Sequence, residues 1–296
     1  MDRYSDIVPS FDAFRDALER PLPLTARANR VRASRDDCVD ALRDLGLEVE
    51  PIDWFADGFE VAGETAGDGD VALGTTLPHH LGWMHVQEEV SMVPPVALDP
   101  DPDDVVIDLC AAPGSKATQL AQDAAAVVAN DDEIGRIPAL RNNADRLGCT
   151  NLAVTNVDGR RYPGDDRFDA ALVDVPCSAE GTARKLPQLR DGTDPQHASS
   201  LAGLQRGLLE RAVDLTRPGG TVVYSTCTFA PEENEAVVAA VTDDVRIESF
   251  DVGLTHEPGL TEWEDERFPE ALIRTHRYYP HQNDTGGFYV AKLRVT

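Results

Sequence analysis

Lysine is scarce in this sequence of 296 residues. Of its 27 basic residues, three are lysines (Lys116, Lys185 and Lys292) and 24 are arginines, against 53 acidic residues and a net charge of −26. The acidic residues are spread along the whole length, which favours a halophilic protein whose carboxylate-rich surface keeps it soluble in molar salt. At ~1 M salt the Debye length is only about 3 Å. The charge therefore does not exclude a nucleic-acid partner, although binding must then rest on shape, hydrogen bonds and stacking rather than on counterion release.

Other absences argue against whole classes of protein. No apolar run approaches the length of a membrane span. The N-terminus, Met-Asp-Arg-Tyr-Ser-Asp, has no signal-peptide pattern, so a cytoplasmic protein without a membrane partner is expected. The five cysteines are odd in number and show no C-x-x-C spacing. This pattern disfavours a disulfide framework and a zinc ribbon, and the sequence predicts no metal site.

From residue 105 onward, short apolar runs alternate with helical segments, which is the pattern of a doubly wound α/β sheet. A long helix is expected from Pro195 to about Leu215, because proline is favoured in the first turn. The turn-rich acidic segment 99–104 is expected to separate this unit, residues 101–296, from a smaller α+β unit at 1–100. The expected strands of the larger unit are 105–109, 127–131, 152–155, 170–173 and 221–227, with a closing pair at 271–274 and 287–293.

The smaller unit is expected to hold a helix at 11–19 and another at 34–45, the second beginning at a capping box of Ser34 and Asp37. Strands are expected at 28–32 and 47–52. Three arginines near the first strand are either RNA-facing or part of a solvated surface: Arg27, Arg30 and Arg32. The segment 75–95 contains three histidines without the spacing of a metal site, and linker and packing roles are expected for His79, His80 and His85.

Polar groups follow three successive strands of the larger unit. A tight loop after the first strand has one glycine, Gly114, so the G-x-G-x-x-G fingerprint is absent and a hydride-transfer enzyme is disfavoured. Asp131 ends the second strand, where it is placed to take ribose hydroxyls, and Asp158 follows the third, where it can accept a hydrogen bond from an adenine amino group. Each acid alone is explained by solvated loops, but the ordered set predicts a nucleoside cofactor.

The apolar strand 170–173 ends at Asp174, Pro176 and Cys177, and the fifth strand ends at Cys227. In the usual doubly wound order these two strands are neighbours, so both thiols emerge at the carboxyl edge beside the cofactor crevice. A single cysteine is more often a small buried hydrophobe, but two at adjacent strand ends favour catalysis. A redox pair is disfavoured in a reducing cytosol, and zinc held by Cys110, Cys177 and Cys227 lacks a fourth ligand.

Three segments in this order, Asp-Leu-Cys-Ala-Ala-Pro-Gly-Ser-Lys, Asp-Val-Pro-Cys-Ser and Ser-Thr-Cys-Thr, resemble the Nop2/Sun (NSUN) family of S-adenosylmethionine-dependent RNA cytosine-C5 methyltransferases. The resemblance covers residues 75–296 and is weaker before them. It implies a Rossmann-like class I methyltransferase fold with S-adenosyl-L-methionine as cofactor and RNA as partner, docked with help from the N-terminal unit. The layout is similar to that of short archaeal members acting on tRNA; ribosomal RNA is the alternative, and a monomer is expected.

The resemblance also implies roles for individual residues. Cys227 would attack carbon 6 of cytosine as a thiolate, because carbon 5 is a poor nucleophile until a thiolate has added to the ring. Cys177 would assist release, Asp174 would hydrogen-bond the cytosine edge, and Lys116 would orient Asp174 and favour the thiolate. Asp131 would bind the ribose, Asp158 the adenine, and Asp174 would border the cofactor. Ser115 stands where many relatives have glycine, and Cys110 is expected to pack rather than react. The implied cofactor loop comprises Cys110, Ala111, Ala112, Pro113, Gly114, Ser115 and Lys116.

Two other classes of function remain as alternatives. An amino-group methyltransferase typically carries a Pro-Pro-aromatic sequence, whereas this chain has Pro176-Cys177. A non-catalytic RNA-binding or ribosome-assembly protein built on a methyltransferase scaffold would not need an intact set of Cys177, Cys227, Asp174 and Lys116.

Overall fold

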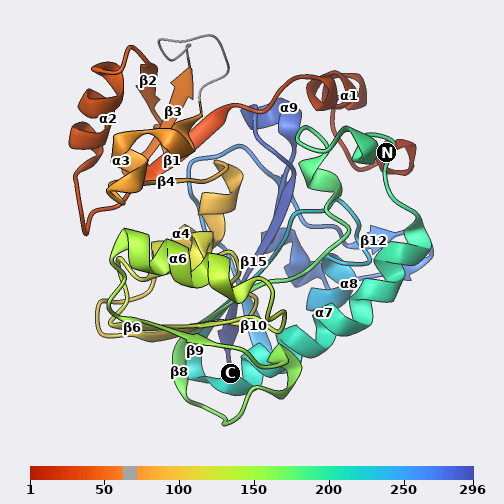
Figure 1. The fold of residues 1–296 in the computed structure, drawn as a ribbon. Coiled ribbons are helices and arrows are strands. Elements are labelled where there is room, and N and C mark those ends of the chain that lie inside the picture. Colours follow the sequence, from red (N-terminus) through yellow and green to blue (C-terminus); the bar gives the residue numbers. More distant parts are fainter. Residues whose placement is uncertain (63–71) are drawn as a thin grey trace.

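The structure is a computed structural model that describes residues 1–62 and 72–296. Its centre is a mixed sheet in the order β11-β14-β15-β9-β8-β5-β6-β7, with β10 paired to β15 (Figure 1). The strands β5 to β9 run parallel to their neighbours, and β15 closes the sheet antiparallel to β9. The predicted doubly wound, Rossmann-like sheet is confirmed. Its strands are β5 (Val105–Asp108), β6 (Ala126–Asn130), β7 (Leu152–Thr155), β8 (Phe168–Asp174), β9 (Thr216–Thr226), β10 (Val245–Glu248), β11 (Glu257–Pro258), β14 (His276–Tyr278) and β15 (Phe288–Val295).

Strand β8 is apolar on both faces because helices cover both. Ala171 and Val173 pack into one core with helix α7, whereas Ala170 and Leu172 pack into a second core with helices α4, α5 and α6. Figure 1 shows α4 and α6 on the side of the sheet away from α7. A fully buried valine or leucine stabilises the fold by roughly 1.5–3 kcal/mol, so the two cores hold this strand firmly. The helices are α4 (Val93–Leu98), α5 (Ser115–Leu120), α6 (Ile137–Leu147), α7 (Pro195–Leu215) and α8 (Glu235–Ala239).

A separate antiparallel sheet in the order β2-β3-β1-β4 forms the small N-terminal unit, drawn in red and orange in Figure 1. Helix α2 (Arg35–Arg43) covers it and begins at the predicted capping box of Ser34 and Asp37. A short helix, α3 (Leu77–His80), precedes the last strand. The strands are β1 (Leu24–Ala28), β2 (Glu48–Pro51), β3 (Gly58–Ala62) and β4 (Met84–Val86).

The strand predicted at 28–32 is wrong, because the chain turns at Asn29. The side-chain amide of Asn29 donates to the carbonyl oxygens of Gly82 and Leu147, and its side-chain oxygen accepts from Val31 N. Such local side-chain bonds compete with a strand ladder and favour a turn. The strand lies earlier, at Leu24–Ala28.

Arg27 is neither RNA-facing nor part of a solvated surface, so both interpretations of the three arginines are wrong for this residue. It is fully buried, and its guanidinium donates to Gln87 Oε1 (2.8 Å), Ser115 O (3.0 Å) and Thr118 Oγ1 (2.8 Å). These bonds fasten the small unit to helix α5. Burial lowers the pKa of Arg27 to about 10, and the group remains cationic at neutral pH.

Two further sequence interpretations need correction. The stretch expected as a linker contains β4, which pairs with β1 as an edge strand. The packing role expected for its histidines holds for His85, which is buried against Ser115 Oγ at 2.9 Å. Residues 271–274, expected as a strand, lie in a 3₁₀ helix, Glu270–Arg274, and the strand paired with β15 is β14. A short apolar run in a sequence is compatible with either a strand or a helical turn, so the pattern alone could not distinguish the two.

Residues before position 24 pack on the large sheet's side of the molecule. Helix α1 (Phe11–Glu19) lies against α9 (Pro280–Asn283), and Tyr4 and Phe14 join a buried aromatic cluster with Phe229 and Tyr279. The division into two units predicted at residue 100 stays a prediction. Residues on the two sides of this position are in contact, as the bonds of Arg27 to α5 show. A small hairpin of β12 (Glu262–Trp263) and β13 (Glu266–Arg267) adjoins this cluster. Within the described residues, no helix is both long and apolar enough to span a membrane.

The acidic surface predicts a salt-dependent stability. Glu50 and Glu60 are both exposed and lie directly opposite each other on β2 and β3. Like charges in this position destabilise a strand pair by roughly 0.2–1 kcal/mol. We expect Glu50→Gln to raise the melting temperature by about 1–3 °C in dilute KCl, and to have little effect in molar KCl, where salt screens the repulsion. Scanning calorimetry tests this, and an equal gain at both salt concentrations would contradict it.

Candidate active site

The two cysteines predicted to act together lie side by side. Strands β8 and β9 are parallel neighbours with Asp174 opposite Ser225, so the loops that follow them leave the same edge of the sheet. The Sγ atoms of Cys177 and Cys227 are 3.2 Å apart. Hydrogen bonding to Cys227 and burial raise the pKa of Cys177 well above its ordinary value, and Cys177 is therefore a neutral thiol at pH 7. The S–H group of Cys177 is therefore close enough to donate a hydrogen bond to the Cys227 sulfur.

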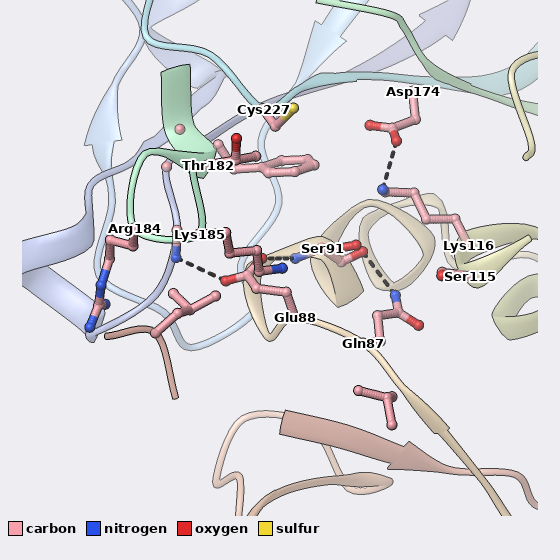
Figure 2. Close-up of a pocket in the computed structure, with 16 residues that line it drawn as sticks. Gln87, Glu88, Ser91, Ser115, Lys116, Asp174, Thr182, Arg184, Lys185 and Cys227 are labelled. Carbon is pink, nitrogen blue, oxygen red and sulfur yellow. Dashed lines mark hydrogen bonds and ion pairs between the residues drawn. The ribbon is translucent and has the colours of Figure 1, made fainter. Parts of the chain in front are cut away.

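Asp174 lies in an ion pair beside this thiol pair. Lys116 Nζ donates to Asp174 Oδ2 at 2.7 Å, and Ser225 Oγ donates to Asp174 Oδ1 at 2.8 Å. Burial alone would lower the pKa of Lys116, but the attraction and hydrogen bond of Asp174, together with smaller attractions from neighbouring groups, outweigh it and raise the pKa, so the ammonium stays charged. Figure 2 shows the lysine turned toward Asp174, with Cys227 bordering the same pocket. The ion pair therefore places one positive and one negative group in the pocket that Cys227 borders.

The predicted cofactor loop, residues 110–116, connects β5 to α5. Gly114 has φ of +106°, and a Cβ atom there would lie 2.8 Å from Leu140 Cδ1, so the loop needs glycine at this position. Asp131 Oδ2 accepts a hydrogen bond from Ala112 N at 3.0 Å. The acid at the end of the second strand therefore braces the loop as well as facing the cavity beside it.

A cavity of about 250 Å³ lies between the ends of β5, β6 and β7, and Asp131 and Asp158 both line it. Its apolar wall comes from Leu109, Leu208 and Pro176. Asp158 is held by the guanidinium of Arg160, whose hydrogen bond lowers the pKa of Asp158 below its usual range. An apolar slot lined by the carboxyl side chains of Asp131 and Asp158 suits a nucleoside, so the residues present fit the predicted cofactor.

Two further cavities continue from this one toward the cysteines. A cavity of about 170 Å³ is bordered by Asp108, Cys110, Lys116 and Asp174. The next, of about 290 Å³, shares Lys116 and Asp174 and reaches Cys227 (Figure 2). Since consecutive cavities share lining residues, they form one path from the nucleoside slot to the thiols. Burial raises the pKa of Cys110 well above its ordinary value, which leaves it an unreactive thiol, consistent with the predicted packing role.

The last cavity is closed by the small N-terminal unit. Val86, Gln87 and Glu88 contribute to its wall from β4 and the segment after it. Arg184 and Lys185 also line it. Arg184 is buried and donates to the carbonyl oxygens of Arg20, Pro21 and Thr285, so it supports the loop between Gly181 and Lys185 at the cavity's edge. Strand β4, missed in the sequence, thus supplies part of the pocket.

Asp108 is a site residue that sequence reasoning missed. It ends β5, is 1% exposed, and faces the ion pair of Lys116 and Asp174. Burial and then repulsion from Asp174 raise the pKa of Asp108 to about 7. Its position at the end of the first parallel strand was the available signal, because the carboxyl ends of such strands face the ligand crevice. Ser225, whose hydroxyl donates to Asp174, was also missed, because nothing in the sequence indicated that it contacts this residue.

The fold and this path of cavities define a Rossmann-like methyltransferase. A family model described as 16S rRNA methyltransferase RsmB/F matches residues 95–294. The chain belongs to this family, which is of the Nop2/Sun type, and the resemblance inferred from its motifs is confirmed. Family members use S-adenosylmethionine.

Individual relatives agree with this assignment. The chain is 36% identical over 295 residues to ribosomal RNA small subunit methyltransferase F of Aliivibrio fischeri, covering 96% of this chain and 60% of that protein. The protein of the same name from Escherichia coli is 36% identical over 296 residues, covering 97% and 60%. The chain thus spans 60% of the length of these curated relatives.

Solved structures also match along nearly the whole chain. A methyltransferase homolog protein from Pyrococcus horikoshii has a TM-score of 0.85 at 32% identity, covering 100% of this chain and 94% of that one. NSun6 from Pyrococcus horikoshii has a TM-score of 0.85 at 22% identity, covering 99% and 97%, which supports the fold.

The raised pKa of Asp108 predicts that cofactor binding depends on pH. S-adenosylmethionine carries an ammonium and a sulfonium cation, which favour the ionised form of a carboxyl nearby. Below pH 7 the carboxyl of Asp108 is protonated, so binding must then release its proton. We expect the affinity to fall on the order of tenfold from pH 8 to pH 6, measured by calorimetry. Asp108→Asn should bind more weakly at pH 8 and show no such slope; a flat profile for the unchanged protein would contradict the assignment.

Proposed function

We propose that this chain is an S-adenosylmethionine-dependent RNA (cytosine-C5)-methyltransferase that acts through a covalent bond between Cys227 and its substrate. The observation that carries the proposal is the 3.2 Å contact between Cys177 and Cys227 at the end of a cavity that also holds the Asp174–Lys116 pair. An amino-group methyltransferase needs neither thiol. A scaffold that had lost its chemistry would not need all four side chains together.

The cofactor's binding residues follow from the cavities. Asp131 and Asp158 would take the ribose and adenine, and the loop 110–116 with Asp108 would hold the methionine end. When bound, S-adenosylmethionine supplies a methyl group on its sulfonium for the activated base. Lys116 and Asp174 lie where the cofactor and base cavities join, so they border both ligands.

Cys227 would begin the reaction as a thiolate. Its sulfur forms a bond to carbon 6 of cytosine, and the electrons displaced from the 5,6 double bond make carbon 5 nucleophilic. The charged ammonium of Lys116 attracts the negative charge of the thiolate and holds Asp174 toward the cavity. Asp174 would bind the N3 and amino edge of cytosine, stabilising the charge that develops on the ring. A base inside a polymer must first be flipped out of its stack to enter this cavity.

Cys177 would act at the end of the reaction. After methyl transfer, the proton on carbon 5 passes to a base, the bond between carbon 6 and Cys227 breaks, and the thiolate of Cys227 is released. A neutral Cys177 thiol 3.2 Å away can donate a hydrogen bond to that leaving sulfur. Without this stabilisation, departure of Cys227 slows and the covalent complex persists.

Two classes of RNA are candidates for the substrate. The layout of the motifs favours tRNA, whereas the names of its relatives at 36% identity favour small-subunit ribosomal RNA. Transfer of a labelled methyl group to purified tRNA and to deproteinised 16S rRNA in molar salt separates the two, and bisulfite sequencing then locates the cytosine.

The two cysteines predict opposite phenotypes. We expect Cys227→Ala to abolish methyl transfer, because no sulfur remains to activate carbon 5. We expect Cys177→Ala to form a covalent protein–RNA complex that survives denaturing electrophoresis, because attack proceeds while release is slowed. Cys149→Ala is the matched control: this half-buried cysteine lies outside the three cavities and should leave turnover unchanged. Methyl transfer that persists in Cys227→Ala would exclude the thiolate mechanism.

A further inference from the structure

A buried polar cluster lies directly behind the two cysteine loops. It consists of Ser178, Gln205, Thr228 and Glu233, here called the clasp, and none of its members is more than 6% exposed. Ser178 follows Cys177 and Thr228 follows Cys227 in the chain. Gln205 lies on α7 and Glu233 precedes α8, so two distant segments reach the loops. The predicted mechanism uses none of these four residues.

Three hydrogen bonds of the clasp end on the Glu233 carboxylate, two from Ser178 and one from Gln205. Ser178 N donates to Glu233 Oε2 at 3.0 Å, and Ser178 Oγ donates to Glu233 Oε1. Since the serine hydroxyl has one proton, the 2.7 Å bond to Thr228 Oγ1 must have threonine as its donor. Thr228 therefore donates to Ser178, which donates to Glu233. The bond between the two hydroxyl groups joins the loop of Cys177 to the loop of Cys227, and the Glu233 carboxylate fixes its direction by accepting the Ser178 proton.

Gln205 extends this connection to the residue before Cys177. Its Nε2 donates to Glu233 Oε2 at 2.7 Å and to the carbonyl oxygen of Pro176 at 2.9 Å. The backbone on both sides of Cys177 is therefore held, directly or through Gln205, by Glu233. Burial raises the pKa of Glu233 even though the bonds from Ser178 and Gln205 lower it. A buried carboxylate is costly unless donors surround it, and here the donors belong to the site's own loops.

The loop of Cys227 has supports that do not involve Glu233. The carbonyl oxygen of Cys227 accepts from Gly181 N at 2.9 Å. Asn234 accepts from Thr226 Oγ1 at 2.6 Å and donates to the carbonyl oxygen of Thr228 at 3.1 Å. Loss of the Glu233 carboxylate would therefore release Cys177 more than Cys227.

We propose that Glu233 is a positioning residue that holds the Cys177 thiol against the Cys227 sulfur, and thereby sets the rate at which methylated RNA is released. This inference rests on the function proposed above. Glu233 does not touch the substrate; it acts by holding the backbone around Cys177. The clasp is needed for release of Cys227 and not for its attack, which separates this role from a general contribution to folding.

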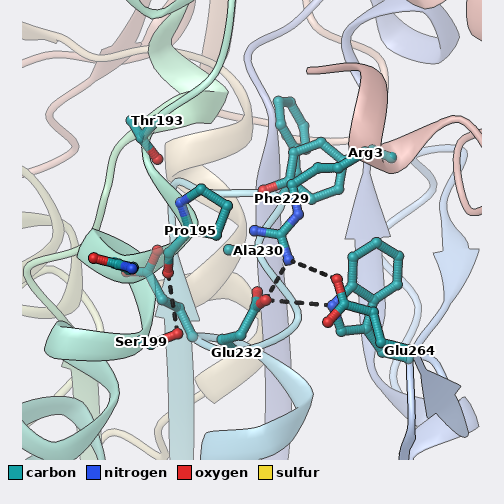
Figure 3. Close-up of polar contacts among 12 residues, drawn as sticks. Arg3, Thr193, Pro195, Ser199, Phe229, Ala230, Glu232 and Glu264 are labelled. Atoms are coloured by element: carbon teal, nitrogen blue, oxygen red, sulfur yellow. Dashed lines mark hydrogen bonds and ion pairs between the residues drawn. The ribbon is translucent and has the colours of Figure 1, made fainter.

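The neighbouring acid provides a matched control. Glu232 reaches Arg3 of the N-terminal segment (Figure 3) and Trp263 of β12. Trp263 Nε1 donates to Glu232 Oε1 at 3.3 Å, and Arg3 forms an ion pair with the same carboxylate. Glu232→Gln therefore removes one carboxylate beside Glu233 in the chain without changing a contact of either cysteine loop.

The test is the fraction of protein bound covalently to methylated RNA at steady state. Glu233→Gln removes the negative charge and one of the two acceptor oxygens, so the charge-assisted bonds from Ser178 and Gln205 weaken, the Ser178 hydroxyl must reorient, and the loop shifts. We expect Glu233→Gln to accumulate the covalent complex at least tenfold over the unchanged protein, as Cys177→Ala does, while retaining cofactor binding by calorimetry. We expect Glu232→Gln to release RNA normally. A merely structural role for Glu233 would lower the amount of folded protein and produce no excess of complex.

The remaining outcomes are also decisive. Release at the normal rate in a folded Glu233→Gln protein would overturn the proposal. If this variant fails to bind cofactor, Ser178→Ala replaces it: this change removes the hydroxyl link between the loops and keeps Glu233, and normal release would again overturn the proposal. If Cys177→Ala itself forms no complex while the unchanged protein methylates RNA, the release step of the proposed function fails, and the role of Glu233 falls with it. If Cys177→Ala accumulates the covalent complex but neither Glu233→Gln nor Ser178→Ala does, the role proposed for Glu233 is wrong while the proposed function stands.

Discussion

The contact between the Cys177 and Cys227 sulfur atoms is the interaction on which the account of this protein depends. It exists because β8 and β9 are parallel neighbours, with Asp174 opposite Ser225, so that two loops separated by about fifty residues of chain leave the sheet together. Helices on both faces of the sheet bury β8 and leave little freedom for a change of register, since a shift by one residue would exchange its two apolar faces. The clasp behind the loops then holds the thiols at their separation.

A line of charged groups connects this pair to the cofactor cavities. Asp108, Lys116 and Asp174 come from the ends of β5, the start of α5 and the end of β8, and they lie where the cavities meet. Burial, and after it repulsion from Asp174, raise the pKa of Asp108, the more buried of the two carboxyls around the Lys116 ammonium. The entry of a cationic cofactor would relieve that repulsion. The same residues would thus link cofactor binding to the charge state of the site that receives the base.

Much of the site could be predicted from the sequence because its residues lie at strand ends. Apolar runs located β5 to β9, and the α/β rule that ligands bind at carboxyl ends placed Asp131, Asp158, Asp174, Cys177 and Cys227 at one edge. Residues such as Glu233 and Gln205 could not be found in this way. They reach the cysteines from α7 and the segment before α8, and nothing in their local pattern says which loop they contact.

The small N-terminal unit was predicted less well, also for physical reasons. Arg27 was expected on the surface because arginine is seldom buried, but acceptor oxygens of Gln87, Ser115 and Thr118 make a buried site for it. Strand β4 is three residues long and has an edge position, so it lacks a periodic signal. Its role in closing the base cavity emerges only once the two sheets are placed together.

RNA containing 5-fluorocytosine tests the central claim most directly. Fluorine replaces the hydrogen on carbon 5 that a base must remove, so the bond between carbon 6 and the attacking sulfur cannot break after methyl transfer. Peptide mass mapping of the unchanged protein, treated with this RNA and S-adenosylmethionine, should find a methylated fluorocytosine attached to the peptide that contains Cys227. Attachment at Cys177, or methylation of ordinary RNA with no attachment to any cysteine, would contradict the account.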